Sequence, residues 1–388
     1  MHTRPDRLPL HPMEKSHALE MREAIREQAR SVGFDRVGFA PAKLPSEAPR
    51  LAEWLARGYH GEMAWMERNS GRRTDGERSF AGTGTLLCCG LNYYQGPREP
   101  ASALKGVIST YAQGDDYHDV LGEKLKQLAR FLSDRFELPA KIYVDTGPLL
   151  EKGYAVAAGL GWLGKHGNVI SRRGSSWFFL GEILLPIVLP PDAPESDHCG
   201  TCHRCMDACP TAAIVEPFVV DSRLCISYLT IELRGFVPRH LRALIGNRIY
   251  GCDDCQDVCP WNRFAEKSEE AAFFPREPLA SLDLIAMLRL SRDEYLGATK
   301  GSAIRRARYA GFLRNVAIAL GNSGDSRALP ALVEALDHAE PLVRGHSAWA
   351  LGRLGERQAL APLRQRLGRE EKDVVREEIE WALRELGG

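Results

Sequence analysis

The strongest constraint on this chain is a run of closely spaced cysteines that ends in a proline. The run has a C-x2-C-x2-C-x3-C-P pattern and comprises Cys199, Cys202, Cys205 and Cys209. Two-residue loops bring three thiolates to one iron–sulfur cuboid, and the fourth cysteine of such a run ligates a different cluster. The pattern therefore predicts iron–sulfur ligation.

A second cysteine run completes the ligand count for two clusters. Cys252, Cys255 and Cys259 form a C-x2-C-x3-C-P pattern, and Cys225 lies alone between the two runs. Because the cysteine before each proline reaches the other cluster, we expect Cys259 to join Cys199, Cys202 and Cys205. The second 4Fe-4S cluster then takes Cys209, Cys225, Cys252 and Cys255. Structural zinc also favours x2 spacing, but it does not explain the two C-x3-C-P endings.

Composition limits the number of domains and the cellular location that we expect, but it indicates no binding partner. Its 388 residues are enough for two or three domains, and its 51 basic and 51 acidic side chains balance. Eight of ten cysteines act as ligands in this interpretation, which favours a reducing, cytoplasmic location over a disulfide scaffold. The most apolar stretch, residues 177–191, contains Glu182 and three prolines, so we expect no membrane span.

The order of patterns predicts a multidomain α+β chain. Residues 1–17 read as a disordered leader. Alternating strands and helices over residues 18–190 indicate an α/β domain. Residues 191–264 form the cysteine section, which we expect to be ferredoxin-like, and a polar linker leads to helical repeats over residues 280–388. Predicted helices cover 18–32, 46–58 and 117–136, with Asp116 at a helix start, and predicted strands cover 35–40, 85–94, 107–111 and 141–144.

The C-terminal part repeats itself at a step of 31 residues. Leu320-Gly321 recurs as Leu351-Gly352 within longer similar segments, and a third, less exact copy follows. Helical repeats of this size stack into a short HEAT-like solenoid, because no single helix pair buries its own apolar face. Such surfaces commonly bind another macromolecule.

A carboxylate follows the strand predicted at residues 141–144. Asp145 ends this strand, and Thr146-Gly147-Pro148 then interrupts it before a helix. In an α/β domain, ligands enter at such strand ends. The alternative, an aspartate that only caps the following helix, is equally compatible with the sequence.

These patterns together resemble the epoxyqueuosine reductases. The resemblance rests on Asp145-Thr146-Gly147-Pro148 with Glu151, on Gly161-Trp162-x-Gly164-Lys165, on the cysteine section and on the helical tail. It implies the last step of queuosine biosynthesis, the reduction of epoxyqueuosine at the tRNA wobble position, with base-off cobalamin and two 4Fe-4S clusters. By position, Asp145 would be the proton donor, kept protonated by burial. The residues that the resemblance places around the corrinoid are Arg68, Asp145, His166, Val169, Leu180 and Ser222.

Basic residues without acidic neighbours point to tRNA independently. Residues 295–324 contain no acidic residue, and residues 233–252 contain none either. Such runs usually neutralise phosphates, here those of an anticodon stem-loop, although a solvated helix face is the alternative. The residues that we expect to contact tRNA are Lys300, Arg305, Arg306, Arg308 and Arg314.

Two other functions compete with this interpretation. A corrinoid reductase of small molecules, similar to the reductive dehalogenases, would share the cofactors but would not need the helical tail. An electron-transfer scaffold would leave the N-terminal domain and Asp145 without a role. For the tRNA-modifying enzyme we expect a monomer that receives electrons from a low-potential donor.

Overall fold

The computed structural model describes residues 14–97, 102–276 and 282–387. Most of the predicted leader and the predicted domain start at residue 280 lie outside these ranges. Helix α1 (Lys15–Ser31) begins three residues before the predicted helix start, so the last residues assigned to the leader are helical. No helix among the described residues combines the length and apolarity needed to cross a membrane.

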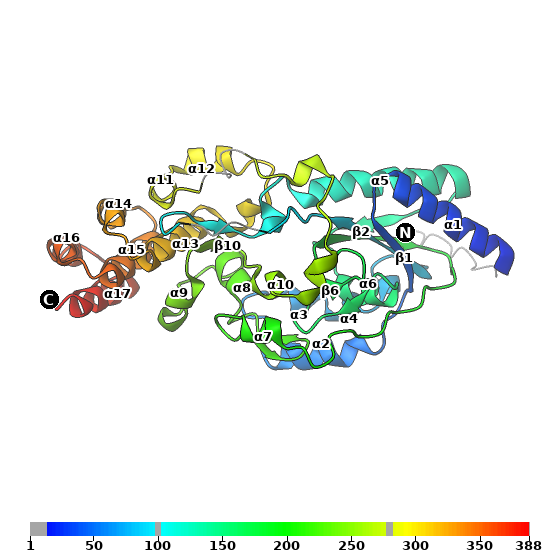
Figure 1. The fold of residues 1–388 in the computed structure, drawn as a ribbon, viewed down its shortest axis with the longest axis horizontal. Helices are drawn as coiled ribbons and strands as arrows, with labels where there is room; N and C mark the ends of the chain where they lie inside the picture. Colours follow the sequence, from blue (N-terminus) through cyan, green and yellow to red (C-terminus); the bar gives the residue numbers. More distant parts are fainter. Residues whose placement is uncertain (1–13, 98–101, 277–281, 388) are drawn as a thin grey trace, which may run out of the picture.

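A four-stranded sheet forms the centre of the N-terminal domain (Figure 1). Its order is β1 (Arg36–Pro41), β2 (Thr85–Asn92), β7 (Phe178–Leu185) and β4 (Lys141–Tyr143). Every neighbouring pair is antiparallel. The prediction of an α/β domain is therefore wrong in its strand direction. The strands predicted at 35–40, 85–94 and 141–144 correspond to β1, β2 and β4, but β7, which was not predicted, inserts between β2 and β4, so no crossover helix connects parallel neighbours.

Helices cover both faces of this sheet. Alternate residues of β2 pack on α1 and α5 (Tyr117–Phe136) on one side, and on α6 (Glu151–Ala157) on the other. Helix α5 presents a leucine every three or four residues to the sheet, at Leu121, Leu125, Leu128 and Leu132, all fully buried. Helix α2 (Glu47–Ala56) and the short helices α3 (Trp65–Arg68) and α4 (Ser70–Arg73) lie between β1 and β2 in the chain.

The cysteine section consists of short elements. In chain order these are α7 (Arg204–Asp207), β8 (Ile214–Glu216), β9 (Val219–Val220), α8 (Ile226–Ile231), α9 (Arg239–Ile245), β10 (Arg248–Tyr250) and α10 (Asp254–Asp257). Helices α7 and α10, one from each cysteine run, pack against each other. Strand β10 pairs in parallel with β3 (Val107–Ile108), a segment of the N-terminal domain. The strand predicted at 107–111 thus ends early.

The C-terminal helices stack at one end of the molecule (Figure 1). They are α11 (Leu284–Leu288), α12 (Arg292–Ala298), α13 (Tyr309–Asn322), α14 (Leu329–Ala335), α15 (Pro341–Leu354), α16 (Leu360–Leu367) and α17 (Asp373–Glu385). The repeated glycines lie where these helices touch. A Cβ added at Gly321 would lie 2.7 Å from Ala350 Cα, and one at Gly352 would lie 2.7 Å from Ala382 Cα.

One hydrophobic core joins the cysteine section to the helical tail. It runs from Tyr228, Ile245 and Tyr250 through α13 to Leu386, and it includes Ile108 of β3. The predicted boundary near residue 264 therefore does not separate two cores.

Candidate active site and thiol groups

Asp145 follows β4 in a loop that fixes its backbone and side chain. Its φ of 54° is left-handed, which is rare for a residue with a side chain. Its backbone N–H donates to Glu151 Oε1 at 2.6 Å, and the Tyr117 hydroxyl donates to Asp145 Oδ2 at 3.0 Å. Helix α6 begins at Glu151 with Leu150 as its N-cap. The alternative that Asp145 caps this helix is therefore wrong.

His118 connects Asp145 to a second carboxylate. Its Nδ1 lies 2.7 Å from Asp116 Oδ1, and its Nε2 lies 3.4 Å from Asp145 Oδ2. Burial lowers the pKa of His118, but the two carboxylates outweigh this effect and raise it to about 9. The imidazole is therefore protonated at neutral pH. Asp116 also caps α5, as predicted, by accepting from the His118 backbone N–H.

Asp145 is charged in this arrangement. Burial raises its pKa, but the interactions with His118 and Tyr117, together with the charge of Arg306, lower it overall. The side chain is also 60% exposed. The protein alone therefore does not keep Asp145 protonated, and its protonation by burial against a corrin stays a prediction. Sequence reasoning missed His118 and Tyr117, although their position directly after Asp116 was visible.

A second pair of carboxyl groups lies behind the Asp145 loop. Glu182 of β7 is completely buried, and the carboxyl group that it meets is that of Glu151, with which it shares a hydrogen bond. Burial and the nearby Glu151 hold the pKa of Glu182 well above its usual value. Burial also raises the pKa of Glu151 to about 8. The pair therefore retains protons at neutral pH.

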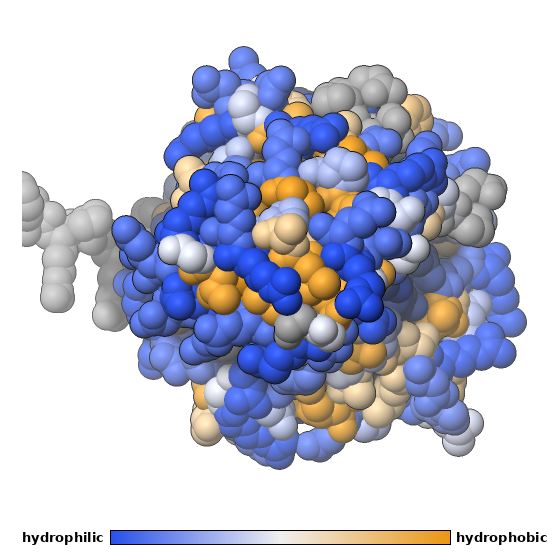
Figure 2. All heavy atoms as spheres, turned by 90° about the vertical axis from the view of Figure 1, so that its left-hand side faces the viewer, coloured by the Kyte–Doolittle hydropathy of each residue, from blue (hydrophilic) through white to orange (hydrophobic). Residues whose placement is uncertain are grey.

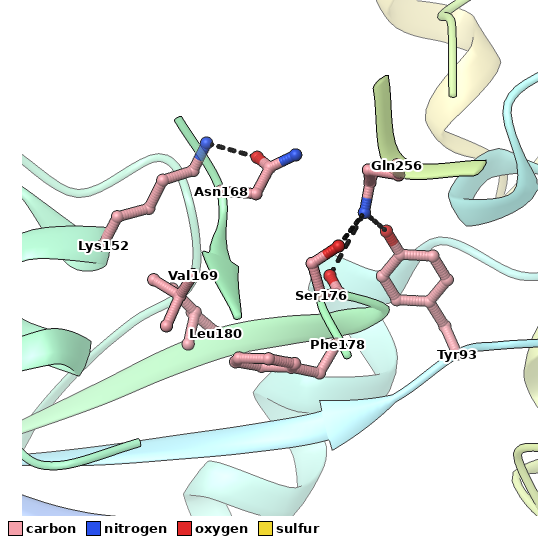
Figure 3. Close-up of a pocket in the computed structure, with 8 residues that line it drawn as sticks. All are labelled: Tyr93, Lys152, Asn168, Val169, Ser176, Phe178, Leu180 and Gln256. Atoms are coloured by element: carbon pink, nitrogen blue, oxygen red, sulfur yellow. Dashed lines mark hydrogen bonds between the residues drawn. The ribbon is translucent and has the colours of Figure 1, made fainter. Parts of the chain in front are cut away.

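A small pocket lies between β7 and the cysteine section (Figure 3). Apolar side chains from β6 (Val169–Ile170) and β7 form one side, and polar groups form the other. Lys152 reaches across it to donate to Asn168 Oδ1 at 2.7 Å. Gln256 Nε2 donates to the Ser176 hydroxyl at 3.1 Å. The lining residues are Tyr93, Lys152, Asn168, Val169, Ser176, Phe178, Leu180 and Gln256.

The residues predicted around a corrinoid are only partly gathered at this pocket. Val169 and Leu180 line it. His166 is buried nearby on the hairpin of β5 (Trp162–Leu163) and β6, where burial lowers its pKa to about 4 and its Nε2 has no hydrogen-bond partner among the described residues. Arg68, at the exposed end of α3, and Ser222, whose backbone N–H donates to Tyr59, are not among the lining residues.

Four of the cysteines form a first thiol group. Burial, together with the neighbouring Cys199, Cys259 and Cys202, raises the pKa of Cys205 to about 11. Burial also raises the pKa of Cys259, as do Cys199 and Cys202. The first thiol group thus joins one cysteine of the second run to three of the first.

The other four cysteines form a second thiol group. Burial, together with Cys225, Cys252 and Cys209, holds the pKa of Cys255 well above its usual value. Cys225 and Cys255 in turn raise the pKa of Lys152, although burial lowers it overall. Because Lys152 also lines the pocket and responds to Asp145, the second thiol group lies on the pocket side of the cysteine section.

The predicted tRNA contacts divide into exposed and buried residues. Lys300, Arg305, Arg306 and Arg308 are exposed. Arg306 lies over the Trp65 ring at 5.0 Å and pairs with Glu232 at 2.9 Å.

Arg314 has a structural role instead. Its guanidinium is 1% exposed and donates to the backbone carbonyls of Leu229, Leu233 and Gly235. The prediction that Arg314 contacts tRNA is therefore wrong, because α8 and the segment after it cover its side chain. The neighbouring Asn315 likewise donates to Thr230 and Ile249 carbonyls.

Family models match three parts of the chain. A model described as epoxyqueuosine reductase QueG matches residues 73–146, a 4Fe-4S double cluster binding domain matches residues 198–262, and HEAT repeats match residues 302–384. The epoxyqueuosine reductase of Escherichia coli K12 is 42% identical over 361 residues, covering 90% of this chain and 95% of that protein. The Pseudomonas aeruginosa epoxyqueuosine reductase is 43% identical, with 86% and 94% covered.

Two solved structures of epoxyqueuosine reductases are also similar to this chain. An epoxyqueuosine reductase crystallised with an epoxyqueuosine-modified tRNA-Tyr stem loop has a TM-score of 0.88 and 31% identity, covering 96% of this chain and all of that one. A Bacillus subtilis epoxyqueuosine reductase, in which a catalytic loop carrying an aspartate is swung out of the active site, also has a TM-score of 0.88, at 30% identity, covering 95% of this chain and all of that one.

Proposed function

Because this chain belongs to the epoxyqueuosine reductase family, we propose that it reduces epoxyqueuosine to queuosine at the wobble position of tRNA. Reduction of the epoxide to an alkene takes two electrons and two protons and releases the oxygen as water. The observation that carries the proposal is the placement of Asp145 and its proton-holding neighbours beside a pocket flanked by the second thiol group.

The two thiol groups are the proposed cluster sites. Each contains four cysteines, and each joins the two runs in the way that two-cluster ferredoxins do. Filled with 4Fe-4S clusters, they would carry electrons one at a time from a low-potential donor towards the pocket. The first thiol group would accept electrons, since the second lies nearer Lys152 and the pocket. All of these residues come from one chain, so we propose that the enzyme works as a monomer.

The pocket between these clusters and Asp145 would form one part of the proposed cobalamin site, since its volume of about 70 Å³ is too small for a whole corrin ring. Its apolar side chains suit a corrin face, while its ammonium and amide groups suit the amide side chains around the ring. The unpartnered Nε2 of His166 offers one more group for a ligand. Val169 and Leu180 would contact the ring, with Arg68, His166 and Ser222 at its edge. Bound there, cobalamin would supply the reduced cobalt centre needed to open the epoxide.

Asp145 would handle the proton that the departing oxygen needs. In the proposal the protonated His118, which Asp116 orients, supplies the proton, and Asp145 Oδ2 passes it to the departing oxygen. The Tyr117 hydroxyl holds the carboxylate in place, and Tyr117 itself stacks on Phe179 at 4.4 Å. The aspartate-bearing catalytic loop of the Bacillus subtilis relative supports this role.

The helical tail and its base would hold the tRNA. The relative crystallised with a modified stem loop supports an anticodon stem-loop as the substrate. Lys300, Arg305, Arg306 and Arg308 would neutralise phosphates. Seen from the tail end, the surface is mostly hydrophilic around smaller apolar patches (Figure 2). Arg306 acts electrostatically on Asp145, so it lies where an unstacked wobble nucleoside would enter the site.

The test is turnover by the purified chain. Protein isolated without oxygen and loaded with cobalamin should contain about eight irons per chain. Given a low-potential reductant, it should convert epoxyqueuosine to queuosine in tRNA from cells that lack the activity, as measured by mass spectrometry of the nucleosides. Absence of conversion by fully loaded protein would overturn the proposal. Conversion of a halogenated small molecule but not of the tRNA would favour the dehalogenase-like alternative.

A further inference from the structure

Two side chains of the hairpin formed by β5 (Trp162–Leu163) and β6, those of Trp162 and Lys165, have no role in the chemistry described so far. The hairpin carries the Gly161-Trp162-x-Gly164-Lys165 motif. Its two strands approach so closely that neither Gly161 nor Gly164 has room for a side chain. A Cβ at Gly161 would lie 2.0 Å from the Ile170 carbonyl oxygen, and one at Gly164 would lie 2.6 Å from Ile170 Cδ1. The hairpin is therefore a rigid mount for the side chains of Trp162 and Lys165.

The Trp162 side chain is buried against the first thiol group. It is 2% exposed and packs in one apolar cluster with Cys259 and Cys199. Its indole Nε1 has no hydrogen-bond partner among the described residues. Because the ring packs against Cys199 and Cys259, this buried N–H is available to a sulfur of a cluster held there.

Lys165 brings a positive charge to the same thiol group. Its Nζ donates to the Gly200 carbonyl at 2.7 Å and to the Cys202 carbonyl at 2.9 Å. These carbonyls belong to the loop between the first two cysteines of the run. The ammonium is therefore fixed beside the loop that would wrap the cluster.

We propose that Trp162 and Lys165 raise the reduction potential of the cluster held by the first thiol group. This inference rests on the proposed cluster ligation. Reduction adds one negative charge to a cluster, and hydrogen bonds to its sulfurs and nearby cations stabilise that charge. The cluster that takes electrons from the donor would then be reduced more readily. Trp162 and Lys165 are positioning residues in this account, because they act through the cluster.

The experiment is a redox titration of the intact, loaded enzyme followed by electron paramagnetic resonance. The variants are W162F, which keeps the ring bulk but removes the N–H, and K165M, which removes the charge. The control is W261F. Trp261 packs on Trp162 with ring centroids 4.8 Å apart and lies in the same apolar cluster, and its hydrogen bond to Cys259 comes from its backbone.

We expect W162F and K165M each to disfavour reduction of one cluster by roughly tenfold, which is about 59 mV for a one-electron couple. The other cluster and the W261F variant should keep wild-type potentials. Unchanged potentials in both W162F and K165M, with both clusters present, would overturn the inference while leaving the proposed function intact. If W162F loses iron, the K165M titration decides. Wild-type protein that binds no iron would instead overturn the proposed function.

Discussion

At the scale of single residues, Asp145 depends on neighbours that come from distant parts of the chain. Its left-handed backbone is held by Glu151, and its carboxylate is held by Tyr117 and His118 of α5. A left-handed backbone at an aspartate is strained and persists only where the surrounding structure holds it. Such strain is common at functional sites.

The first prediction concerns the proton at Asp145. Asp145→Asn keeps an oxygen for the Tyr117 hydroxyl but removes the carboxylate that would pass a proton from His118 to the substrate. Turnover of epoxyqueuosine tRNA should fall on the order of a hundredfold or more, the usual contribution of a placed general acid. Single-turnover rates measure this, and Asp119→Asn, an exposed change in the same helix as Tyr117, is the control. Near-normal turnover in Asp145→Asn would end the catalytic role.

The second prediction concerns the buried Glu182. Its pKa is raised in the folded state, so ionisation opposes folding once the pH exceeds the value for an unfolded glutamate. Stability is then lost as pH rises, by about 1.4 kcal/mol per pH unit until the folded-state pKa is reached. Glu182→Gln mimics the neutral acid and should escape this loss. Denaturant unfolding from pH 5 to 8 should therefore show a growing advantage of the variant over wild type.

The exposed Glu123→Gln should show no such trend. An advantage of Glu182→Gln that does not change with pH would contradict a neutral, buried carboxyl group at this position.

Residue roles could be predicted only where spacing sets the geometry. The cysteine pattern predicts two ligand groups, and within each predicted group the thiols raise one another's pKa. By contrast, a count of basic residues cannot tell exposed Arg305 from buried Arg314, because tertiary packing decides which guanidinium faces carbonyls. The protonation state of Asp145 was also beyond the sequence, since it depends on His118, 27 positions earlier.

At the scale of elements, the recurring Leu-Gly pairs mark helix contacts. Helices α13, α15 and α17 approach so closely that a methyl group at Gly352 would meet the backbone of Ala382. Gly352→Ala should therefore lower the free energy of unfolding by about 1–3 kcal/mol through overpacking. The higher helix propensity of alanine offsets up to about 1 kcal/mol of this loss. Gly311→Ala in α13, where nothing lies within 4 Å of the added methyl, should stabilise instead. Thermal unfolding of both variants measures the difference, and equal shifts would contradict the contact.

The sheet shows what periodicity does and does not determine. Apolar runs located the strands at 85–94 and 141–144 to within two residues at either end. They carry no information on direction, because a buried strand of either orientation is apolar on both faces. The insertion of β7 between β2 and β4 depends on long-range packing that no local pattern records.

At the scale of the whole molecule, the exposed basic residues predict how affinity responds to salt. Replacing Arg305 and Arg308 with glutamine should weaken tRNA binding and reduce the slope of log affinity against log salt by about one per lost phosphate contact. Arg327→Gln removes an exposed charge that Asp325 already neutralises, so it should have little effect. Titration at several salt concentrations measures this. An unchanged slope in the double variant would place the tRNA elsewhere.

The shared core has a consequence for how the protein is made. The loop with Cys225 and the strand before Cys252 are fixed by Arg314 and Asn315 of α13, which are synthesised more than sixty residues later than either cysteine. During translation, a ribosome-bound chain whose eight ligand cysteines have all been synthesised still lacks the helix that holds the segments next to Cys225 and Cys252. Metal insertion into the second thiol group must then await a nearly complete polypeptide, and a transcript truncated before α13 would yield a scaffold that exposes thiols without holding iron.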